Sequence, residues 1–312
     1  MFQNFDDDSS NKEIAPRVKA LRARLAKMKL DGMIVPREDE YQGEYVPAAN
    51  ERLKWISGFG GSAGTAIVLA PKAALFIDGR YILQAPKQTD TKLFTIVDVM
   101  QNPPSHWLAA TAKKGMQIGL DPRLHSETAV KAYRDRLAAK GARLVLLDEN
   151  PLDAEWRDRP ELPDTPVVIQ PTRLTGRSSE QKRKALAADM KKAGHDILLV
   201  AQPENIAWLL NIRAQDVPHT PFALSFGLLH KNGNFDWFIR HSRVSATVRA
   251  HIGSGLKLYR QGDMLAKLKS LTGKTVAFDP TNTPAWFAEQ MVNANLVRVT
   301  DPCALPKAAK HK

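Results

Sequence analysis

The sequence predicts an α/β protein with two tandem domains of similar fold, each a mixed β-sheet flanked by helices, as three observations indicate. Segments with apolar residues at helical spacing alternate with short β-branched runs, the order expected of α/β layers. A length of 312 residues exceeds what one ordinary core organises. The order of elements also restarts after a proline-rich segment at 150–172. We therefore place a linker in that segment and expect domains over residues 1–164 and 165–312.

Each element predicted in the first half depends on a local pattern. Residues 13–30 are expected to form an amphipathic helix that ends at Gly32. The apolar residues on its inner face are Val18, Leu21, Leu25 and Met28. Strands are expected where short β-branched runs are bounded by Gly, Pro or Asp. The expected strands are 33–35, 65–70, 73–77, 93–97, 117–120 and 144–147, and the further helices are 50–56, 105–114 and 126–139.

The second half repeats this order. A helix at 179–193 ends at Gly194, and Asn232-Gly233 between two apolar runs predicts a hairpin over 224–240. The other expected strands are 197–200, 276–278 and 296–299, and the other helices are 203–210, 242–252, 263–271 and 284–291. Three landmark pairs recur at offsets of 162, 153 and 158 residues: Gly32 with Gly194, Trp55 with Trp208, and Pro122 with Pro280. The recurrence predicts one fold used twice.

The stretch 55–84, WISGFGGSAGTAIVLAPKAALFIDGRYILQ, matches two functional patterns. Residues 58–63 fit the dinucleotide pattern G-x-G-x-x-A, and residues 60–64 fit G-x-S-x-G, which would make Ser62 the nucleophile of a serine hydrolase. Both patterns need a helix directly after the glycines. The β-branched run at 65–69, closed by Pro71, predicts a strand instead. A Gly-rich entry to a hairpin is therefore favoured, and the serine hydrolase is kept as a third hypothesis.

The net charge of +12 is concentrated in the second half. Residues 1–164 hold 24 Lys and Arg against 23 Asp and Glu, whereas residues 165–312 hold 21 against 10. A basic half can indicate nucleic-acid binding, but no zinc-finger, KH or RNP pattern accompanies it. A basic surface that meets an acidic partner domain or subunit fits the composition as well. We predict no nucleic-acid partner.

The cellular compartment is predicted from the lack of membrane-spanning and signal-peptide patterns and of a second cysteine. No apolar run is long enough to span a membrane, and residues 1–11 have no apolar core typical of a signal peptide. The single cysteine, Cys303, excludes an internal disulfide. We therefore expect a cytoplasmic protein without a membrane partner.

Two residues are candidates for ligand contact. Arg80 follows the turn pair Asp78-Gly79, so its guanidinium could contact a carboxylate or carbonyl, or form only a surface ion pair. His219 lies in a polar, Pro-rich loop at 213–221, where it is either a turn or domain-contact residue or faces a ligand. The eight histidines form no zinc-binding pattern. The residues by themselves predict no catalytic group and no metal ligand.

Five segments, taken together and in this order, resemble the three-domain, cytosolic-type Xaa-Pro aminopeptidases. They are WISGFGGSAGTAIV, FIDGRYILQA, the strand end Asp121-Pro122, EWRDRP at 155–160, and NIRAQDVPHTP at 211–221. The resemblance covers residues from about 17 to 307. It implies two creatinase-type N-terminal domains followed by a third, "pita-bread" domain, in which two Asp, two Glu and one His hold two divalent ions, usually manganese.

None of those metal ligands is recognised in this sequence, which ends about where the third domain would begin. We therefore expect the non-catalytic N-terminal part of the enzyme, with the pita-bread domain absent, no cofactor in this chain and no activity alone. The expected partners are the missing catalytic domain, a peptide with proline second, and another copy in a homodimer. The alternative is a stand-alone protein-interaction module of the creatinase N-terminal fold.

The resemblance also implies roles for the two candidates. Arg80 matches the arginine of the family's Asp-Gly-Arg-Tyr motif, which reaches towards bound substrate. His219 falls in the loop that resembles the family's Asn-Leu-Arg-Gly-x-Asp-Val segment, although Ala214 and Gln215 depart from its usual Gly-Ser. Ser62 is structural under this interpretation.

Overall fold

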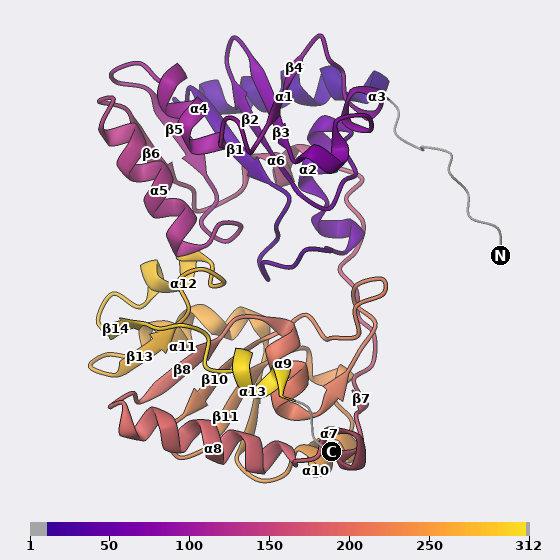
Figure 1. The fold of residues 1–312 in the computed structure, drawn as a ribbon, viewed down its shortest axis with the longest axis vertical. Helices are drawn as coiled ribbons and strands as arrows, with labels where there is room; N and C mark the ends of the chain where they lie inside the picture. The colour runs from indigo at the N-terminus through magenta and orange to yellow at the C-terminus, as the bar shows by residue number, and fades with distance from the viewer. Residues whose placement is uncertain (1–10, 310–312) are drawn as a thin grey trace, which may run out of the picture. The chain divides into compact units, whose positions relative to one another are not determined.

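The computed structural model describes residues 11–309, so most of the N-terminal segment assessed for a signal peptide lies outside the described residues. Within that range the chain divides into two compact units (Figure 1). The first comprises residues 11–39, 48–125 and 129–161, and the second comprises 40–47, 126–128 and 162–309. The domain boundary at 164/165 stays a prediction.

The first unit contains a six-stranded mixed sheet of order β4-β3-β2-β1-β5-β6. Its strands are β1 (Gly32–Pro36), β2 (Gly64–Leu69), β3 (Ala73–Ile77), β4 (Phe94–Asp98), β5 (Gln117–Leu120) and β6 (Arg143–Leu146). Strand β2 is antiparallel to both β1 and β3, and the β3–β4, β1–β5 and β5–β6 pairs are parallel. Strand β2 is therefore the one antiparallel strand in an otherwise parallel six-stranded sheet.

The helices of the first unit bury apolar side chains against this sheet. They are α1 (Ile14–Lys27), α2 (Arg52–Ser57), α3 (Ala85–Gln88), α4 (Pro104–Thr111), α5 (Glu127–Ala138) and α6 (Pro151–Glu155), with 3₁₀ turns η1 (Asn11–Glu13), η2 (Ala48–Asn50) and η3 (Gly79–Tyr81). Val18 and Leu21 of α1 and Leu53 of α2 join one core with Met33 and Val35 of β1. Burial of these faces, rather than helix propensity, stabilises such short helices.

The second unit repeats the sheet with the order β12-β11-β10-β8-β13-β14. Its strands are β8 (Ile197–Val200), β10 (Phe226–His230), β11 (Phe235–Phe238), β12 (Leu256–Tyr259), β13 (Thr275–Phe278) and β14 (Asn295–Arg298), and a separate pair is formed by β7 (Val168–Ile169) and β9 (Ile212–Arg213). Strand β10 is antiparallel to β8 and β11, and the other pairs are parallel, as in the first unit. The prediction of two similar tandem domains is confirmed.

Helices cover both faces of the second sheet (Figure 1). They are α7 (Thr172–Thr175), α8 (Ser179–Lys192), α9 (Pro203–Leu210), α10 (Ala246–Ile252), α11 (Met264–Lys269), α12 (Ala285–Gln290) and α13 (Ala304–Ala308), with 3₁₀ turns η4 (His241–Arg243) and η5 (Gln261–Asp263). Leu198 packs in the core formed with α8, α9 and α10, whereas its neighbour Leu199 packs with α11 and α12. This alternation is the two-residue period of a strand with both faces buried.

The end of α1 differs from the prediction. Met28 is 42% exposed, and Lys29 has the left-handed φ of 58° that turns the chain after the helix. Gly32 instead begins β1, where glycine is required because a Cβ would lie 2.7 Å from the Val68 carbonyl oxygen in the neighbouring strand. Gly194, with φ of 76°, turns the chain after α8 in the same way as Lys29 turns it after α1. The landmark pair Gly32 with Gly194 was therefore wrong, although the repeat is real.

The proline-rich segment is only partly a linker. Pro151 occupies the first turn of α6, where its fixed φ suits a helix start. Leu152 and Trp156 are buried in the core of the first unit. Residues 156–167 have neither helix nor strand. Elements missed by the sequence reasoning were short ones, chiefly β12 and the helices α3, α7 and α13.

Candidate functional site

The Gly-rich loop of the first unit connects α2 to β2. Gly58 ends α2 with φ of 80°, and a Cβ there would lie 2.2 Å from the Gln88 carbonyl oxygen. The Gly60 N–H donates to the Gln88 side-chain oxygen at 3.0 Å. Only glycine allows this conformation and this close approach, so the loop is fixed against the segment that follows β3.

Ser62 is held by Tyr81. Its backbone N–H donates to the phenol oxygen at 3.1 Å, and its Oγ lies 2.9 Å from the same atom. Strand β2 follows the glycines directly, so the helix required by a nucleophile elbow or a dinucleotide site is absent at this position. Ser62 therefore ties the loop to the Tyr81 turn, as the structural interpretation expected.

Arg80 lies in η3, immediately after β3. The side chain of Asp78 caps this turn by accepting the Arg80 N–H at 2.9 Å, and it also binds the Arg80 guanidinium through Nη2 at 2.6 Å and Nε at 3.0 Å. The hydrogen bond from the Arg80 side chain is the main reason that the pKa of Asp78 is lowered from its ordinary value. The Arg80 side chain is 62% exposed, and its guanidinium lies over the Tyr81 ring at 5.1 Å. The turn thus presents an oriented donor group to solvent.

His219 occupies the tip of a turn in the second unit. The Thr220 N–H donates to the Val217 carbonyl oxygen at 3.2 Å, with Pro218 and His219 between them. His219 is exposed and has φ of 62°. Proline followed by a residue with positive φ is the arrangement of a type II turn, in which glycine is the usual residue at the position of His219. Non-glycine residues with such a backbone concentrate at functional sites.

Asp216 anchors this loop, and the sequence reasoning missed its role. Arg243 Nη2 binds its two carboxylate oxygens at 2.7 and 2.6 Å, Thr165 Oγ1 donates to it at 2.5 Å, and the Leu224 N–H donates at 2.8 Å. Both Asp216 and Arg243 are buried. No local signal revealed it, because the partners that a buried carboxylate needs come from residues distant in the sequence.

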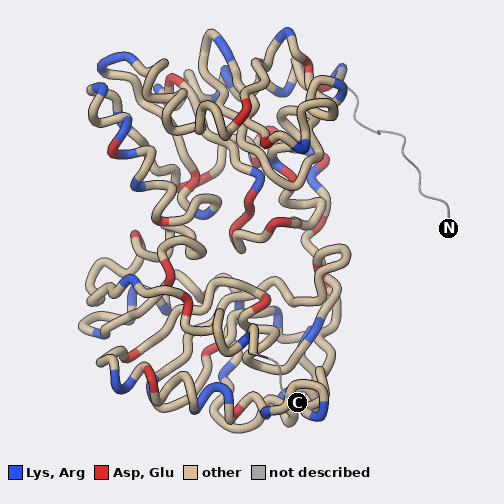
Figure 2. The backbone as a smooth tube through the Cα atoms, in the orientation of Figure 1, with Lys and Arg blue, Asp and Glu red and all other residues tan. Residues whose placement is uncertain are grey.

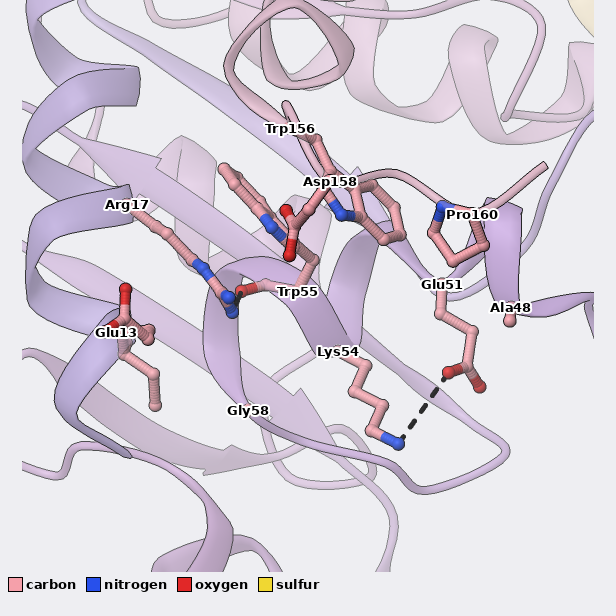
Figure 3. A pocket seen from close by; sticks show the side chains of 11 residues that line it. Glu13, Arg17, Ala48, Glu51, Lys54, Trp55, Gly58, Trp156, Asp158 and Pro160 are labelled. Carbon is pink, nitrogen blue, oxygen red and sulfur yellow. Dashed lines mark hydrogen bonds and ion pairs between the residues drawn. The ribbon is translucent and has the colours of Figure 1, made fainter. Parts of the chain in front are cut away.

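A pocket of about 320 Å³ in the first unit brings two of the resembling segments together (Figure 3). Its lining residues are Glu13, Ile14, Arg17, Ala48, Glu51, Lys54, Trp55, Gly58, Trp156, Asp158 and Pro160. Trp55 comes from the WISGFGG segment and Trp156 from EWRDRP, and their rings stack at 5.7 Å with an angle of 25°. The pairing was not predictable from either segment alone.

Charged groups surround these indoles. The Arg17 guanidinium lies over the Trp55 ring at 4.9 Å, and Arg159 lies over Trp156 at 5.8 Å. Lys54 and Glu51 at the rim are 3.8 Å apart, as the dashed line in Figure 3 marks. The residues lining this pocket include carboxylates, cations and indoles but no hydroxyl or thiol nucleophile. The pocket therefore offers charged groups and aromatic faces for contact with a ligand.

Within residues 11–309, no three His, Cys, Asp or Glu side chains are grouped so that they could hold a metal ion. The residues described thus do not fit the two-ion centre that the resemblance implies for a third domain. In the same range, no helix is both long and apolar enough to cross a membrane. Lys and Arg are scattered over both units rather than gathered in one segment (Figure 2).

Comparison with solved structures shows a relative over almost the whole chain. The X-prolyl aminopeptidase from Caenorhabditis elegans, described as a cytosolic enzyme with a di-nuclear active site, superposes with a TM-score of 0.87 and 26% identity. The match covers 96% of this chain and 52% of that protein.

Curated proteins with similar sequences are also described as Xaa-Pro aminopeptidases. A probable Xaa-Pro aminopeptidase P from Aspergillus niger is 30% identical over an alignment that covers 96% of this chain and 51% of the relative. Its counterpart from Aspergillus fumigatus is 31% identical over 309 residues, covering 95% and 47%. This chain spans about half the length of the curated relatives it matches.

Family models divide the chain in the same way as the two sheets. Residues 17–150 and residues 158–312 each match a model described as a creatinase/prolidase N-terminal domain. Each matched range contains one complete six-stranded sheet. The chain therefore belongs to the creatinase/prolidase N-terminal domain family and carries two such domains in tandem.

Proposed function

We propose that this chain is the non-catalytic N-terminal part of a metal-dependent Xaa-Pro aminopeptidase. The observation that supports this most is the continuous similarity of 96% of the chain to about half of an X-prolyl aminopeptidase. The complete protein would remove the first residue from peptides with proline second. It would act in the cytoplasm as a homodimer.

The chemistry of the substrate explains why accessory domains are useful. An Xaa-Pro bond is a tertiary amide without an N–H, so it lacks the donor that most peptidases bind. The two metal ions of the catalytic domain, usually manganese, would supply Lewis-acid activation of its carbonyl. The present domains would narrow the entrance to that site and support assembly of the dimer.

Arg80 is the residue proposed to contact substrate. A guanidinium can grip a carbonyl or carboxylate through charge-assisted hydrogen bonds. Its pairing with Asp78 and its position over Tyr81 restrict the side chain before substrate arrives. Because less rotational freedom is then lost on binding, the contact becomes more favourable. His219, at a turn anchored by Asp216, is a second proposed contact.

A chimeric enzyme tests both the proposed function and the role of Arg80. The present chain would replace the matching half of the C. elegans X-prolyl aminopeptidase, and cleavage of an Xaa-Pro peptide would be followed with added Mn²⁺. We expect cleavage by the chimera and none by the 312-residue chain alone. Arg80→Ala should lower kcat/KM of the chimera roughly tenfold, as expected for a lost hydrogen bond to a charged group, and Arg80→Lys should lower it less.

The matched control is Lys131→Ala, which removes another exposed ion pair of the first unit, with Asp135. It should leave kcat/KM unchanged. Equal kcat/KM for Arg80→Ala and the unmodified chimera would show that Arg80 does not contact substrate. Cleavage by the chain alone would contradict the non-catalytic assignment, and Ser62→Ala would then test the serine hydrolase. A folded but inactive chimera would favour the stand-alone interaction module.

A further inference from the structure

A second pocket, of about 400 Å³, lies in the second unit and is lined by Arg240, His241, Ser242, Arg260 and Gln261. No Asp or Glu is among these lining residues. The volume falls within the range of small-molecule sites, about 300–1,000 Å³. The pocket thus combines space for a ligand with hydrogen-bond donors and positive charge.

The sheet explains why two arginines meet there. Strands β11 and β12 are parallel neighbours, with Phe238 opposite Tyr259, and the Ile239 N–H donates to the Tyr259 carbonyl oxygen at 3.0 Å. The carboxyl ends of both strands therefore lie at the same edge of the sheet, and Arg240 and Arg260 follow them directly. In open α/β sheets, ligands commonly bind outside the carboxyl ends of parallel strands.

The backbone at both arginines is fixed by the turns that follow. Arg240 precedes η4, and its carbonyl oxygen accepts the Arg243 N–H at 3.2 Å. Arg260 precedes η5, and its own N–H donates to Asp263 Oδ2 at 3.0 Å. The two guanidiniums are thus carried on defined turns rather than on a long loop.

The two arginines of this pocket differ in their ion pairs. Arg240 Nη1 binds Asp164 at 2.6 Å, and the same carboxylate also lies 3.8 Å from Arg243. Across residues 11–309, no carboxylate lies within ion-pair distance of the Arg260 guanidinium. Arg243 is paired chiefly with the buried Asp216, so within the described residues the arginine of this edge without an ion pair is Arg260, whose guanidinium favours binding of an external anion.

The duplicated fold gives an internal comparison. Turn η3 follows β3 in the first unit as η4 follows β11 in the second. The residue that caps η3 is Asp78, an anion that binds Arg80, whereas the corresponding residue at η4 is Arg240, a cation. The second unit thus has a cation before η4 where the first unit has an anion before η3, and this cation lines a pocket.

We propose that this pocket binds a small molecule through an oxyanion, a phosphate or carboxylate group, gripped by Arg240 and Arg260. Guanidinium groups match both kinds of oxyanion in geometry and form charge-assisted hydrogen bonds with them. Ser242 and His241 add polar groups at the rim. This proposal does not depend on the peptidase function proposed above.

Anion titrations of the 312-residue chain test the proposal. Inorganic phosphate and citrate would be titrated separately by calorimetry at constant ionic strength, with chloride as the reference salt. We expect saturable, millimolar binding of at least one of them, and the tighter of the two identifies the phosphate or carboxylate class. Arg260→Met should weaken that binding at least tenfold. It is the decisive variant, because Arg260 has no ion pair to lose.

Three further variants distinguish binding in this pocket from nonspecific attraction of anions to a basic protein. Arg249→Met removes an exposed arginine of the same unit outside the pocket and should leave the affinity unchanged. Arg240→Met should abolish binding, and Asp164→Asn should tighten it a few fold by removing the internal competitor. The proposal is overturned if Arg260→Met binds as the unmodified chain does, if Arg249→Met loses as much, or if neither anion binds better than chloride.

Discussion

Arg17 Nη1 donates a hydrogen bond to the Trp55 carbonyl oxygen at 2.9 Å while its guanidinium lies 4.9 Å from the centre of the same indole. The second unit repeats this clamp with a different cation. Lys182 Nζ donates to the Trp208 carbonyl oxygen at 2.9 Å and lies 4.8 Å from that indole. In both units a cation on the first long helix holds the end of the short helix that carries the tryptophan. A motif preserved in both copies while its residue type changes indicates a packing requirement.

Lys182 should make stability depend on pH in the alkaline range. Burial lowers its pKa from 10.5 to about 8, with Arg213 adding to the shift. The native chain therefore releases this proton near pH 8, whereas the unfolded chain keeps it to about pH 10.5. Because the unfolded state binds more protons between these values, the free energy of unfolding should rise with pH from about 8 to 10.5.

Urea unfolding at several pH values checks this, and Lys182→Met should lack that rise. Lys191→Met, an exposed position on the same helix, should keep it. The same pH slope in Lys182→Met and the unmodified chain would show that another group titrates.

His125 should destabilise the fold in acid. It is buried, its Nδ1 lies 3.0 Å from the Asp121 carbonyl oxygen, and its Nε2 has no hydrogen-bond partner among the described residues. Burial lowers its pKa from 6.5 to about 4. The unfolded chain then binds a proton that the native chain does not, so stability should fall as pH drops from about 6.5 to 4. The loss is on the order of 3 kcal/mol.

His125→Phe keeps a ring of similar size beside Tyr133, so it serves as the comparison. We expect it to lose less stability than the unmodified chain between pH 7 and pH 4.5 in urea unfolding. The Asp121 carboxyl titrates in both proteins, so its effect cancels in the difference. An identical acid dependence of the two proteins would contradict the assignment to His125.

Breaking the Arg243–Asp216 pair should be costly. Arg243→Met leaves the Asp216 carboxylate buried with fewer partners, and removing one member of such a pair costs about 3–5 kcal/mol. Replacing both residues with apolar ones of similar size should cost less than the sum of the single changes, because no uncompensated charge remains. Urea unfolding of both single variants and the double variant measures this coupling. Additive effects would mean that the two side chains do not interact.

Substitutions at His219 should change the free energy of unfolding according to how well the new residue tolerates a left-handed backbone. A residue with a Cβ in this conformation costs roughly 1–2 kcal/mol, most for β-branched side chains. We therefore expect His219→Gly to be at least as stable as the unmodified chain and His219→Val to be less stable by about 1 kcal/mol or more. At Gln215, an exposed residue without positive φ in the same loop, the order of Gly and Val should reverse. The same order at both positions would contradict a backbone effect at His219.

Much of the fold followed from local patterns. The hairpin at Asn232-Gly233 appears as β10 and β11, and Gly233, with φ of 85°, supplies the left-handed backbone in the loop between them, a conformation that glycine encodes locally. The strand after the Gly-rich loop followed from its β-branched residues. Its presence favoured a hairpin entry over a dinucleotide site or a nucleophile elbow at residues 58–64. The helix boundaries were less accurate: α1 ends before Met28, and Gly32 belongs to β1, where its lack of a Cβ lets β2 approach closely.

The contacts of the candidate sites were decided by tertiary structure. The sequence showed that Arg80 follows a turn, but not that Asp78 binds its guanidinium in two places. It contained Trp55 and Trp156 about a hundred residues apart without indicating that they stack, and Asp216 without indicating Arg243. The sequence by itself determined the class of fold, its duplication and the family it resembles, because these follow from short-range periodicity and ordered motifs. Partners far apart in the chain depend on how the helices and strands pack, and only the folded structure defines that.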